Sequence, residues 1–339
     1  MIQLSFSFII PVFNRPEEVD ELLQSFVNLK GNHDFEIVIV EDGSTNKSDE
    51  VISSFCNKLN ISYYFKENTG PGDSRNFGMK KARGNYFIIL DSDCLLPPNY
   101  LNEVKTYLET RYVDFYGGPD ASHHSFSNIQ KAIDFSMTSF ISTGGIRGGE
   151  NFKQNFQPRS FNMGISKIAF TASKGFGDIH PGEDPDLSIR LKKMGFKSAL
   201  FPNAFVFHKR RISLSKFYNQ VTKFGLVRPI LNNWHPETKK LIFWLPSLFI
   251  IGLIISVTLV AFNLFIPIYV FAIYFLIAFT MALFKYGNIN IAILSIIAIF
   301  IQFYGYGNGF LKSFFHIGIL KQNPRLRFPK LFFKNVQAT

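Results

Sequence analysis

Short apolar runs alternate with amphipathic segments in the N-terminal part of the chain. The apolar runs cover residues 7–12, 35–40, 61–65 and 86–90. Apolar residues recur at helical spacing between them, which predicts helices at 49–59 and 74–82 and another that begins at Pro16. Strands that are apolar on both faces and separated by helices are typical of a parallel sheet. The pattern therefore predicts an α/β fold with a mostly parallel sheet.

A different pattern begins after residue 240. Residues 241–284 form an uncharged stretch of 44 residues, broken by Asn263 and Pro267, and residues 286–311 form another of 26. A membrane-spanning helix needs about 20 apolar residues. The two stretches therefore predict about three membrane segments, which gives a multi-pass protein surrounded by membrane lipids. The predicted organisation is a catalytic domain at 1–235, transmembrane helices at 241–311 and a basic tail at 312–339.

Charge divides the chain in the same way. The chain of 339 residues carries 36 Lys and Arg against 25 Asp and Glu, a formal net charge of +11. Seven of the basic residues and none of the acidic residues lie after residue 240. This distribution excludes a purely soluble protein, a disordered chain and a nucleic-acid binder driven by one large basic domain, so nucleic acid is not an expected partner.

Orientation in the membrane is only partly encoded. Lys239 and Lys240 precede the first span and favour a cytoplasmic position for residues 1–240, at the inner membrane. A third full crossing would place the basic tail outside, against the positive-inside rule, so the number of true crossings stays open. Three glycines in the third segment indicate close helix packing or a break: Gly305, Gly307 and Gly309.

Polar clusters follow three of the predicted strands. Asn14 follows the first, Glu41-Asp42 ends the second, and Asp91-Ser92-Asp93 follows the fourth. Ligands of parallel sheets bind beyond the carboxyl ends of the strands, where these clusters would meet. Asp91 and Asp93 could both reach one hard divalent cation. The same Asp-x-Asp pattern also occurs in simple solvated turns. Glu41-Asp42 could accept hydrogen bonds from a base or ribose, or form a simple turn.

Three further groups could complete a site. Arg75 lies near the start of a short helix, where it suits a phosphate, or it could pair with Asp73 at the surface. Glu183-Asp184 precedes an amphipathic run, so Asp184 could be a helix N-cap before Pro185 and also a general base. His208 follows a strand-like run and could give nitrogen to the same metal, although a lone His is usually structural.

With these residues in hand, the chain resembles the family 2 glycosyltransferases of the GT-A fold over about residues 5–235. Seven short motifs occur in the family's order, and any one of them alone would be weak. They are Ile10-Pro11-Val12-Phe13-Asn14, Val40-Glu41-Asp42-Gly43-Ser44, Asn68-Thr69-Gly70 with Ser74-Arg75-Asn76-Phe77-Gly78, Leu90-Asp91-Ser92-Asp93, Phe161-Asn162-Met163-Gly164, Gly175-Phe176, and Gly182-Glu183-Asp184 with Asp186-Leu187 and Arg190-Leu191.

The resemblance implies an inverting sugar transfer from a nucleotide-sugar donor, UDP- or GDP-linked. Asp42, Glu41, Asn14 and Pro11 would lie around the nucleotide, and Asp91 would face the ribose or the metal. Asp93 would ligate Mg²⁺ or Mn²⁺. Asp184 would deprotonate the acceptor, a glycan or a polyprenyl-linked sugar, while Glu183 would orient. His208 and Arg75 would help to offset charge on the departing diphosphate. Such an enzyme would serve polysaccharide biosynthesis in the cell envelope.

Two departures from the family pattern bear on the choice of function. The pair Glu41-Asp42 replaces the usual Asp-Asp, which affects donor specificity. Residues 220–224 only loosely match the Gln-x-x-Arg-Trp motif of processive synthases, because Lys223 and Phe224 replace Arg and Trp. Transfer of a single sugar is therefore preferred over a processive polysaccharide synthase. A non-catalytic glycosyltransferase-like scaffold is a further alternative, and a nucleotidyltransferase is disfavoured because no Gly-rich phosphate loop with Lys is present.

Overall fold

The computed structural model describes residues 3–31, 34–121, 126–144, 157–209 and 212–333. Contacts divide the chain into two compact units. The sheet unit contains residues 1–123, 153–209 and 332–339, and the helical unit contains residues 124–152 and 210–331. The units are therefore interleaved in sequence. The sequence predicted a catalytic domain, transmembrane helices and a basic tail in three consecutive segments. That division by function stays a prediction.

The sheet unit is built on a seven-stranded sheet of order β3-β2-β1-β4-β8-β6-β9. Strands β1 to β4 are mutually parallel, and β8 runs antiparallel to both β4 and β6. The strands are β1 (Phe6–Val12), β2 (Phe35–Asp42), β3 (Ile61–Lys66), β4 (Tyr86–Leu90), β6 (Phe115–Gly117), β8 (Asn162–Ser166) and β9 (Ser198–Leu200). A three-stranded sheet of order β5-β10-β7 contains β5 (Cys94–Leu95), β10 (Val206–His208) and β7 (Asp120–Ala121). The predicted mostly parallel α/β fold is confirmed.

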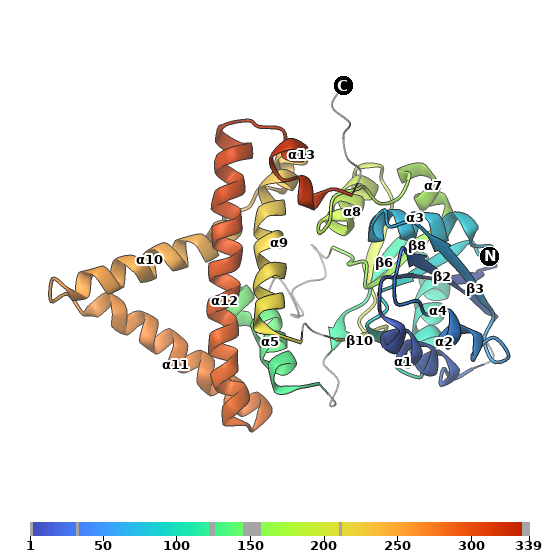
Figure 1. The fold of residues 1–339 in the computed structure, drawn as a ribbon, viewed down its shortest axis with the longest axis horizontal. Coiled ribbons are helices and arrows are strands. Elements are labelled where there is room, and N and C mark those ends of the chain that lie inside the picture. Colours follow the sequence, from blue (N-terminus) through green and yellow to red (C-terminus); the bar gives the residue numbers. More distant parts are fainter. Residues whose placement is uncertain (1–2, 32–33, 122–125, 145–156, 210–211, 334–339) are drawn as a thin grey trace. The chain divides into compact units, whose positions relative to one another are not determined.

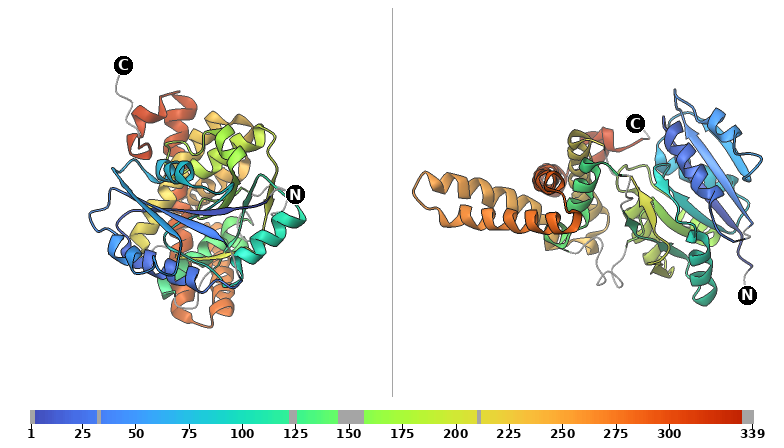
Figure 2. Two further views of the ribbon diagram at one scale, coloured as in Figure 1. Left: turned by 90° about the vertical axis from the view of Figure 1, so that its right-hand side faces the viewer. Right: turned by 90° about the horizontal axis from the view of Figure 1, so that it is seen from below.

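Helices cover both faces of the large sheet (Figures 1 and 2). One core joins Phe8 and Ile10 of β1 to α1, α2 and α4, and the other joins Ile9 and neighbouring strand residues to α3, α7 and α8. Successive strand residues therefore contribute to opposite cores, which explains why the strands carry apolar residues on both faces. The helices are α1 (Pro16–Val27), α2 (Asp49–Ser53), α3 (Pro71–Lys81), α4 (Tyr100–Thr110), α7 (Lys167–Ser173) and α8 (Glu183–Lys193).

Three helix boundaries differ from the sequence prediction. α2 ends at Ser53 instead of residue 59, where the hydroxyls of Ser53 and Ser54 donate hydrogen bonds to backbone carbonyls of the helix and compete with its continuation. α3 begins at Pro71 instead of residue 74, because Gly70 takes φ +93° and Pro71 suits a first helical turn. α8 begins at Glu183 after Gly182, so the expectation that Asp184 is the N-cap was wrong.

The helical unit combines two helices from the middle of the chain with the apolar C-terminal helices. Its elements are α5 (Asn128–Thr138), α6 (Phe140–Thr143), α9 (Leu214–Trp234), α10 (Leu245–Val260), α11 (Ile266–Tyr286), α12 (Ile289–Ser313) and α13 (Pro324–Arg327), together with a π-helical turn at Phe314–Ile319 and 3₁₀ turns at Pro236–Thr238, Leu241–Trp244 and Pro329–Leu331. Figure 1 shows α10 and α11 as a hairpin that leads away from α12. Among the described residues, three segments are long and apolar enough to span a membrane: Leu241–Val260, Ile266–Tyr286 and Ile289–Ile319.

Glycines let α12 lie close to α9. A Cβ on Gly309 would come within 2.4 Å of the Thr222 carbonyl oxygen, and one on Gly305 would come within 2.7 Å of Val221. A Cβ on Gly225 of α9 would meet the Tyr306 carbonyl oxygen at 2.2 Å. The sequence left open whether the glycines of the third segment pack or break the helix. They pack, because α12 runs unbroken through them.

Candidate active site

The strand ends bring the predicted acidic residues to one edge of the sheet. β1, β2 and β4 are parallel neighbours that end at Val12, Asp42 and Leu90. Asp91 directly follows β4, and Asp93 precedes β5. β5 pairs with β10 so that Cys94 lies opposite His208, which carries His208 to the same place from more than a hundred residues along the chain. Topology thus assembles the site that the sequence only suggested.

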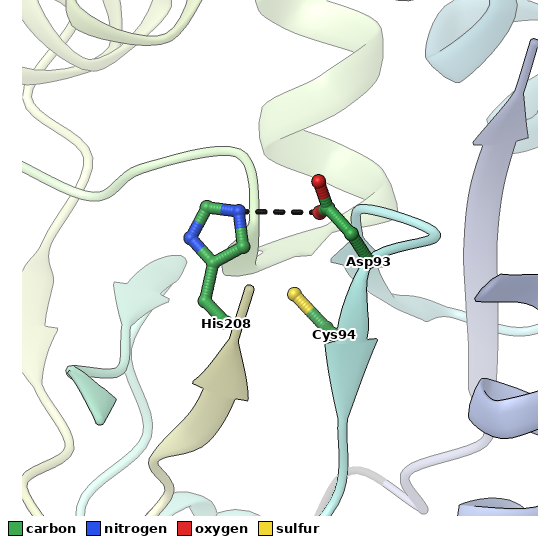
Figure 3. A group of neighbouring side chains, drawn as sticks. All are labelled: Asp93, Cys94 and His208. Atoms are coloured by element: carbon green, nitrogen blue, oxygen red, sulfur yellow. Dashed lines mark ion pairs between the residues drawn. The ribbon is translucent and has the colours of Figure 1, made fainter. Parts of the chain in front are cut away.

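Asp93 lies between two nitrogen-bearing side chains. His208 Nε2 lies 3.2 Å from Asp93 Oδ1, as Figure 3 shows, and Arg15 Nη1 donates a hydrogen bond to Asp93 Oδ2 at 2.7 Å. The Asp93 side chain is only 9% exposed. A Phe161 ring stacks on His208, with centroids 4.6 Å apart, and keeps the imidazole facing Asp93. Burial makes this carboxylate dependent on nearby positive charge.

The group Asp93, Cys94 and His208 could hold a metal ion. Their potential ligand atoms lie within 4.8 Å of one another. A carboxylate oxygen suits Mg²⁺ or Mn²⁺, and the added imidazole nitrogen favours the transition metal Mn²⁺. His208 Nδ1 is also buried without a hydrogen-bond partner, with Asp120 Oδ2 3.9 Å away. Cys94 fits less well, because burial raises the pKa of its thiol well above the ordinary value and its Sγ donates to the Phe161 carbonyl oxygen. The donor set therefore fits a hard divalent cation through Asp93 and His208.

Arg75 joins the end of β4 to the start of α8. Its Nη2 donates to Asp91 at 2.7 Å and its Nη1 donates to Glu183 at 2.9 Å. The guanidinium is 3% exposed and the Glu183 side chain is 4% exposed, whereas Asp91 is 31% exposed. Arg75 therefore does not pair with Asp73 at the surface as the alternative interpretation allowed. Its Nε and Glu183 Oε2 are buried without a hydrogen-bond partner, so this network keeps capacity for a ligand.

Glu183 and Asp184 are adjacent but titrate in opposite directions. Burial works to raise the pKa of Glu183, but the His180 ring at 3.0 Å and Arg75 outweigh it, and the pKa is lowered. Burial raises the pKa of Asp184, and the negative charge of Glu183 raises it further. Arg159, at 3.8 Å, acts in the opposite direction and lowers it. A raised pKa makes a carboxylate a stronger base. Asp184 is therefore better suited to accept a proton, and Glu183 is better suited to stay ionised and hold its partners.

The residues expected around a nucleotide are tied into the scaffold. Asn14, at φ +54°, accepts hydrogen bonds from the backbone of Thr45 and Asn46 and so joins the loops after β1 and β2. Asp42 accepts from Lys66 Nζ at 2.5 Å and from the amides of Thr69 and Gly70. These contacts fix the shape of this edge of the sheet.

Glu41 and Pro11 differ in their exposure. Glu41 is completely buried and accepts hydrogen bonds from the Ser44 hydroxyl and the Ser48 amide, whereas Pro11 of β1 lies opposite Val40 and is half-buried. Direct contact with a nucleotide stays a prediction for Asn14, Asp42 and these two residues.

Several basic side chains of the site were missed by sequence reasoning. Arg15 faces Asp93, Lys66 faces Asp42, Arg159 faces Asp184, and His180 faces Glu183. Two of them carried a usable signal. Arg15 directly follows Asn14 at the end of an apolar strand, and His180 stands three residues before Glu183. Arg159 and Lys66 are brought to their partners only by long-range folding.

Comparison with known proteins relates part of the chain to one family. Residues 7–170 match the model of the family described as Glycosyl transferase family 2. A Rickettsia felis protein named as an uncharacterized glycosyltransferase is 36% identical over 262 residues, which is 70% of this chain and 39% of that protein. A dolichyl N-acetyl-alpha-D-glucosaminyl phosphate 3-beta-D-2,3-diacetamido-2,3-dideoxy-beta-D-glucuronosyltransferase of Methanococcus voltae is 26% identical, over 66% of this chain and 73% of that protein. The chain spans less than half the length of each of four Rickettsia relatives, namely 17%, 39%, 22% and 28%.

A solved structure supports the fold. The mannosyltransferase PcManGT from Pyrobaculum calidifontis, solved with GDP-Man and Mn²⁺, superposes with a TM-score of 0.61 at 15% identity, over 90% of this chain and 88% of that one. The sheet unit thus has a GT-A-like fold, and apolar helices follow it in the chain. The chain carries a glycosyltransferase family 2 domain, and the predicted family and fold are confirmed.

Proposed function

We propose that the protein is a membrane-anchored, inverting, metal-dependent glycosyltransferase. It moves one sugar from a nucleotide-sugar donor to a lipid-linked or cell-surface glycan acceptor at the cytoplasmic face of the membrane. The observation that carries the proposal is the buried guanidinium of Arg75. It holds Asp91 of the expected donor side and Glu183 of the expected acceptor side at 2.7 and 2.9 Å. One side chain therefore links the two halves of the reaction.

The donor would bind at the edge of the sheet where β1, β2 and β4 end. Pro11, Asn14, Glu41 and Asp42 would shape the nucleotide site. Asp93 and His208, with Asp91 nearby, would hold Mg²⁺ or Mn²⁺, and the bound ion would neutralise charge on the diphosphate. The neighbour PcManGT, solved with GDP-Man and Mn²⁺, supports both a nucleotide-sugar donor and a divalent ion. Both UDP-linked and GDP-linked sugars are proposed as donors, because Glu41-Asp42 stands where the family usually has Asp-Asp.

Asp184 would act as the general base. The acceptor oxygen attacks the anomeric carbon from the face opposite the nucleotide, and its proton passes to Asp184. The bond from the anomeric carbon to the diphosphate oxygen breaks, and its electron pair leaves with the nucleoside diphosphate. Glu183 keeps Arg75 in place, and Arg75 with His208 offsets the charge that develops on the leaving group. The raised pKa of Asp184 supports this division of roles.

The acceptor side is proposed from the helical unit and one relative. Three helices are apolar enough to span a membrane, and the Methanococcus voltae relative is named for a dolichyl-linked substrate. Lys239 and Lys240 before the first apolar helix support a cytoplasmic position for the sheet unit at the inner membrane. A lipid-linked sugar in the cell envelope pathway of polysaccharide biosynthesis fits both observations.

The test uses the full chain in detergent with a panel of UDP- and GDP-sugars, Mn²⁺ and polyprenyl-linked acceptors. Wild type should transfer one sugar with inversion. Asp184→Asn should lower kcat about 100-fold or more while donor binding persists, because general-base catalysis contributes about 10²–10⁴-fold. Asp93→Asn should abolish Mn²⁺-dependent donor binding. Asp20→Asn, an exposed carboxylate of α1, is the matched control and should behave as wild type.

Each alternative gives a distinct result. A ladder of longer products on a defined acceptor would indicate a processive synthase. Failure of wild type to bind any nucleotide sugar with Mn²⁺ would indicate a scaffold. Full activity in Asp93→Asn or Asp184→Asn would remove the role assigned to that residue.

A further inference from the structure

The chain returns to the sheet unit after its last helical turn. Phe332 forms an isolated antiparallel bridge with Ile179, and the Phe333 amide donates a hydrogen bond to the Asp178 carbonyl oxygen at 3.2 Å. The Phe332 side chain is 8% exposed. We call Phe332 and Phe333 the C-terminal strap. The strap is therefore bound to the loop that leads into α8.

The Phe333 ring contacts two segments at once. A Cβ on Gly70 would lie 2.3 Å from Cγ of this ring, so the ring rests directly on the Gly70 backbone. The ring centroid also lies 6.0 Å from that of His180, at an interplanar angle of 54°. Gly70 has φ +93° and precedes α3, and His180 precedes α8. The ring thus contacts the residues that lead into both helices, α3 with Arg75 and α8 with Asp184.

Each of the two contacts leads to a residue of the proposed site. The Gly70 amide donates to Asp42 at 2.9 Å. His180 Nδ1 lies 3.0 Å from Glu183 Oε1, the same oxygen that accepts from Arg75. The His180 side chain is 39% exposed, whereas that of Glu183 is 4% exposed. Because Glu183 is enclosed and His180 is not, the position of the imidazole depends on what lies against its outer side.

We propose that Phe333 is a positioning residue for glycosyl transfer. Its ring holds His180 against Glu183 and so fixes the first turn of α8, where Asp184 lies. The inference rests on the proposed function for the role of Asp184. A mutation far from the reacting atoms can lower the reaction rate about 100-fold when it displaces a reacting group by about 1 Å. The ring does not touch Asp184 itself, so a smaller effect is expected.

The experiment compares Phe333→Ala with Phe333→Tyr in the full chain. Phe333→Ala should lower kcat about tenfold, because the base is misplaced in part of the population, and should leave the donor KM within twofold. Phe333→Tyr keeps the ring and should retain wild-type kcat. Phe65→Ala removes a ring that is 49% exposed on β3, compared with 41% for Phe333, and serves as the matched control with wild-type kinetics. Hydrogen exchange of residues 176–183, measured without substrate, should accelerate only in Phe333→Ala.

Three outcomes would overturn the inference. One is unchanged kcat and unchanged exchange in Phe333→Ala. Another is a loss of nucleotide affinity at constant kcat, which would make Phe333 a donor contact. The third is an equal loss in Phe333→Tyr and Phe333→Ala. If wild type transfers no sugar, the proposed function fails by itself, and the exchange measurement still decides whether the strap holds the loop.

Discussion

Arg75→Met removes the cation that holds Asp91 and Glu183. The guanidinium is 3% exposed and lies 2.7 Å from Asp91 and 2.9 Å from Glu183. Asp91, at 31% exposed, can recover water, but Glu183 at 4% cannot. Breaking a buried pair by removing one partner costs about 3–5 kcal/mol. This is a large part of the roughly 5–15 kcal/mol that stabilises a folded domain.

The assay is the thermal unfolding midpoint of the purified chain in detergent. A change of 1 kcal/mol shifts Tm by about 2–4 °C in a domain of about 150–250 residues, so Arg75→Met should lower Tm by about 6–20 °C. Lys105→Met is the control. Lys105 pairs with Glu109 at 3.9 Å, and the two side chains are 47% and 58% exposed. Such exposed pairs contribute about 0–1 kcal/mol. Adding Glu183→Gln to Arg75→Met should recover part of the loss, because no buried charge then lacks its partner.

The stability that Arg75→Met loses should depend on pH in a defined direction. The lowered pKa of Glu183 contributes stability above the ordinary glutamate value of about 4.3, and this stability is lost as pH falls through the folded-state pKa. In Arg75→Met, burial remains and the guanidinium is gone, so Glu183 protonates at higher pH. The Tm gap between wild type and variant should therefore narrow in acid. A Tm within 2 °C of wild type at neutral pH, or a gap that widens in acid, would refute the reasoning.

Four other predictions concern further contacts of the structure. Asp184→Asn should leave Tm at neutral pH unchanged or higher, because burial raises the pKa of Asp184 and the folded state disfavours its ionised form; a fall would contradict this. Since Arg159 opposes that rise, Arg159→Gln should shift the acid limb of kcat/KM to higher pH, which a pH–rate profile measures. Arg15→Gln should tighten Mn²⁺ binding to the donor-free chain about fivefold in a calorimetric titration, as expected from losing a competing pair of about 1 kcal/mol; weaker binding would show that Arg15 supports the metal. Gly309→Ala should lower Tm, because its Cβ would meet the Thr222 carbonyl oxygen at 2.4 Å, while Gly252→Ala, whose nearest atom is 3.4 Å away, should not.

The central strands were predictable because burial on both faces dominates their sequence. β1 to β4 begin and end within two residues of the predicted runs, since each run is mostly apolar. Helix starts were less predictable. Gly70 and Gly182 take φ +93° and +119°, and a glycine in the sequence does not reveal which conformation it adopts. The antiparallel insertion of β8 beside β4 depends on long-range pairing that no local pattern encodes.

The candidate site was predictable in its acids and not in its cations. Acidic residues stand out when they follow an apolar strand, as Asp91 and Asp93 do. Arg159 and Lys66 are ordinary surface residues by sequence, and only folding brings them to Asp184 and Asp42. The strap was missed for a different reason. Forty phenylalanines in the chain make two more in a basic tail uninformative.

The most direct measurement is Mn²⁺ binding followed by electron paramagnetic resonance, with and without nucleoside diphosphate. The account predicts one bound Mn²⁺ per wild-type chain, with affinity that increases when UDP or GDP is added, and loss of this site in Asp93→Asn but not in Asp20→Asn. Equal Mn²⁺ and nucleotide binding in wild type and Asp93→Asn would contradict a metal-assisted donor site at the end of β4.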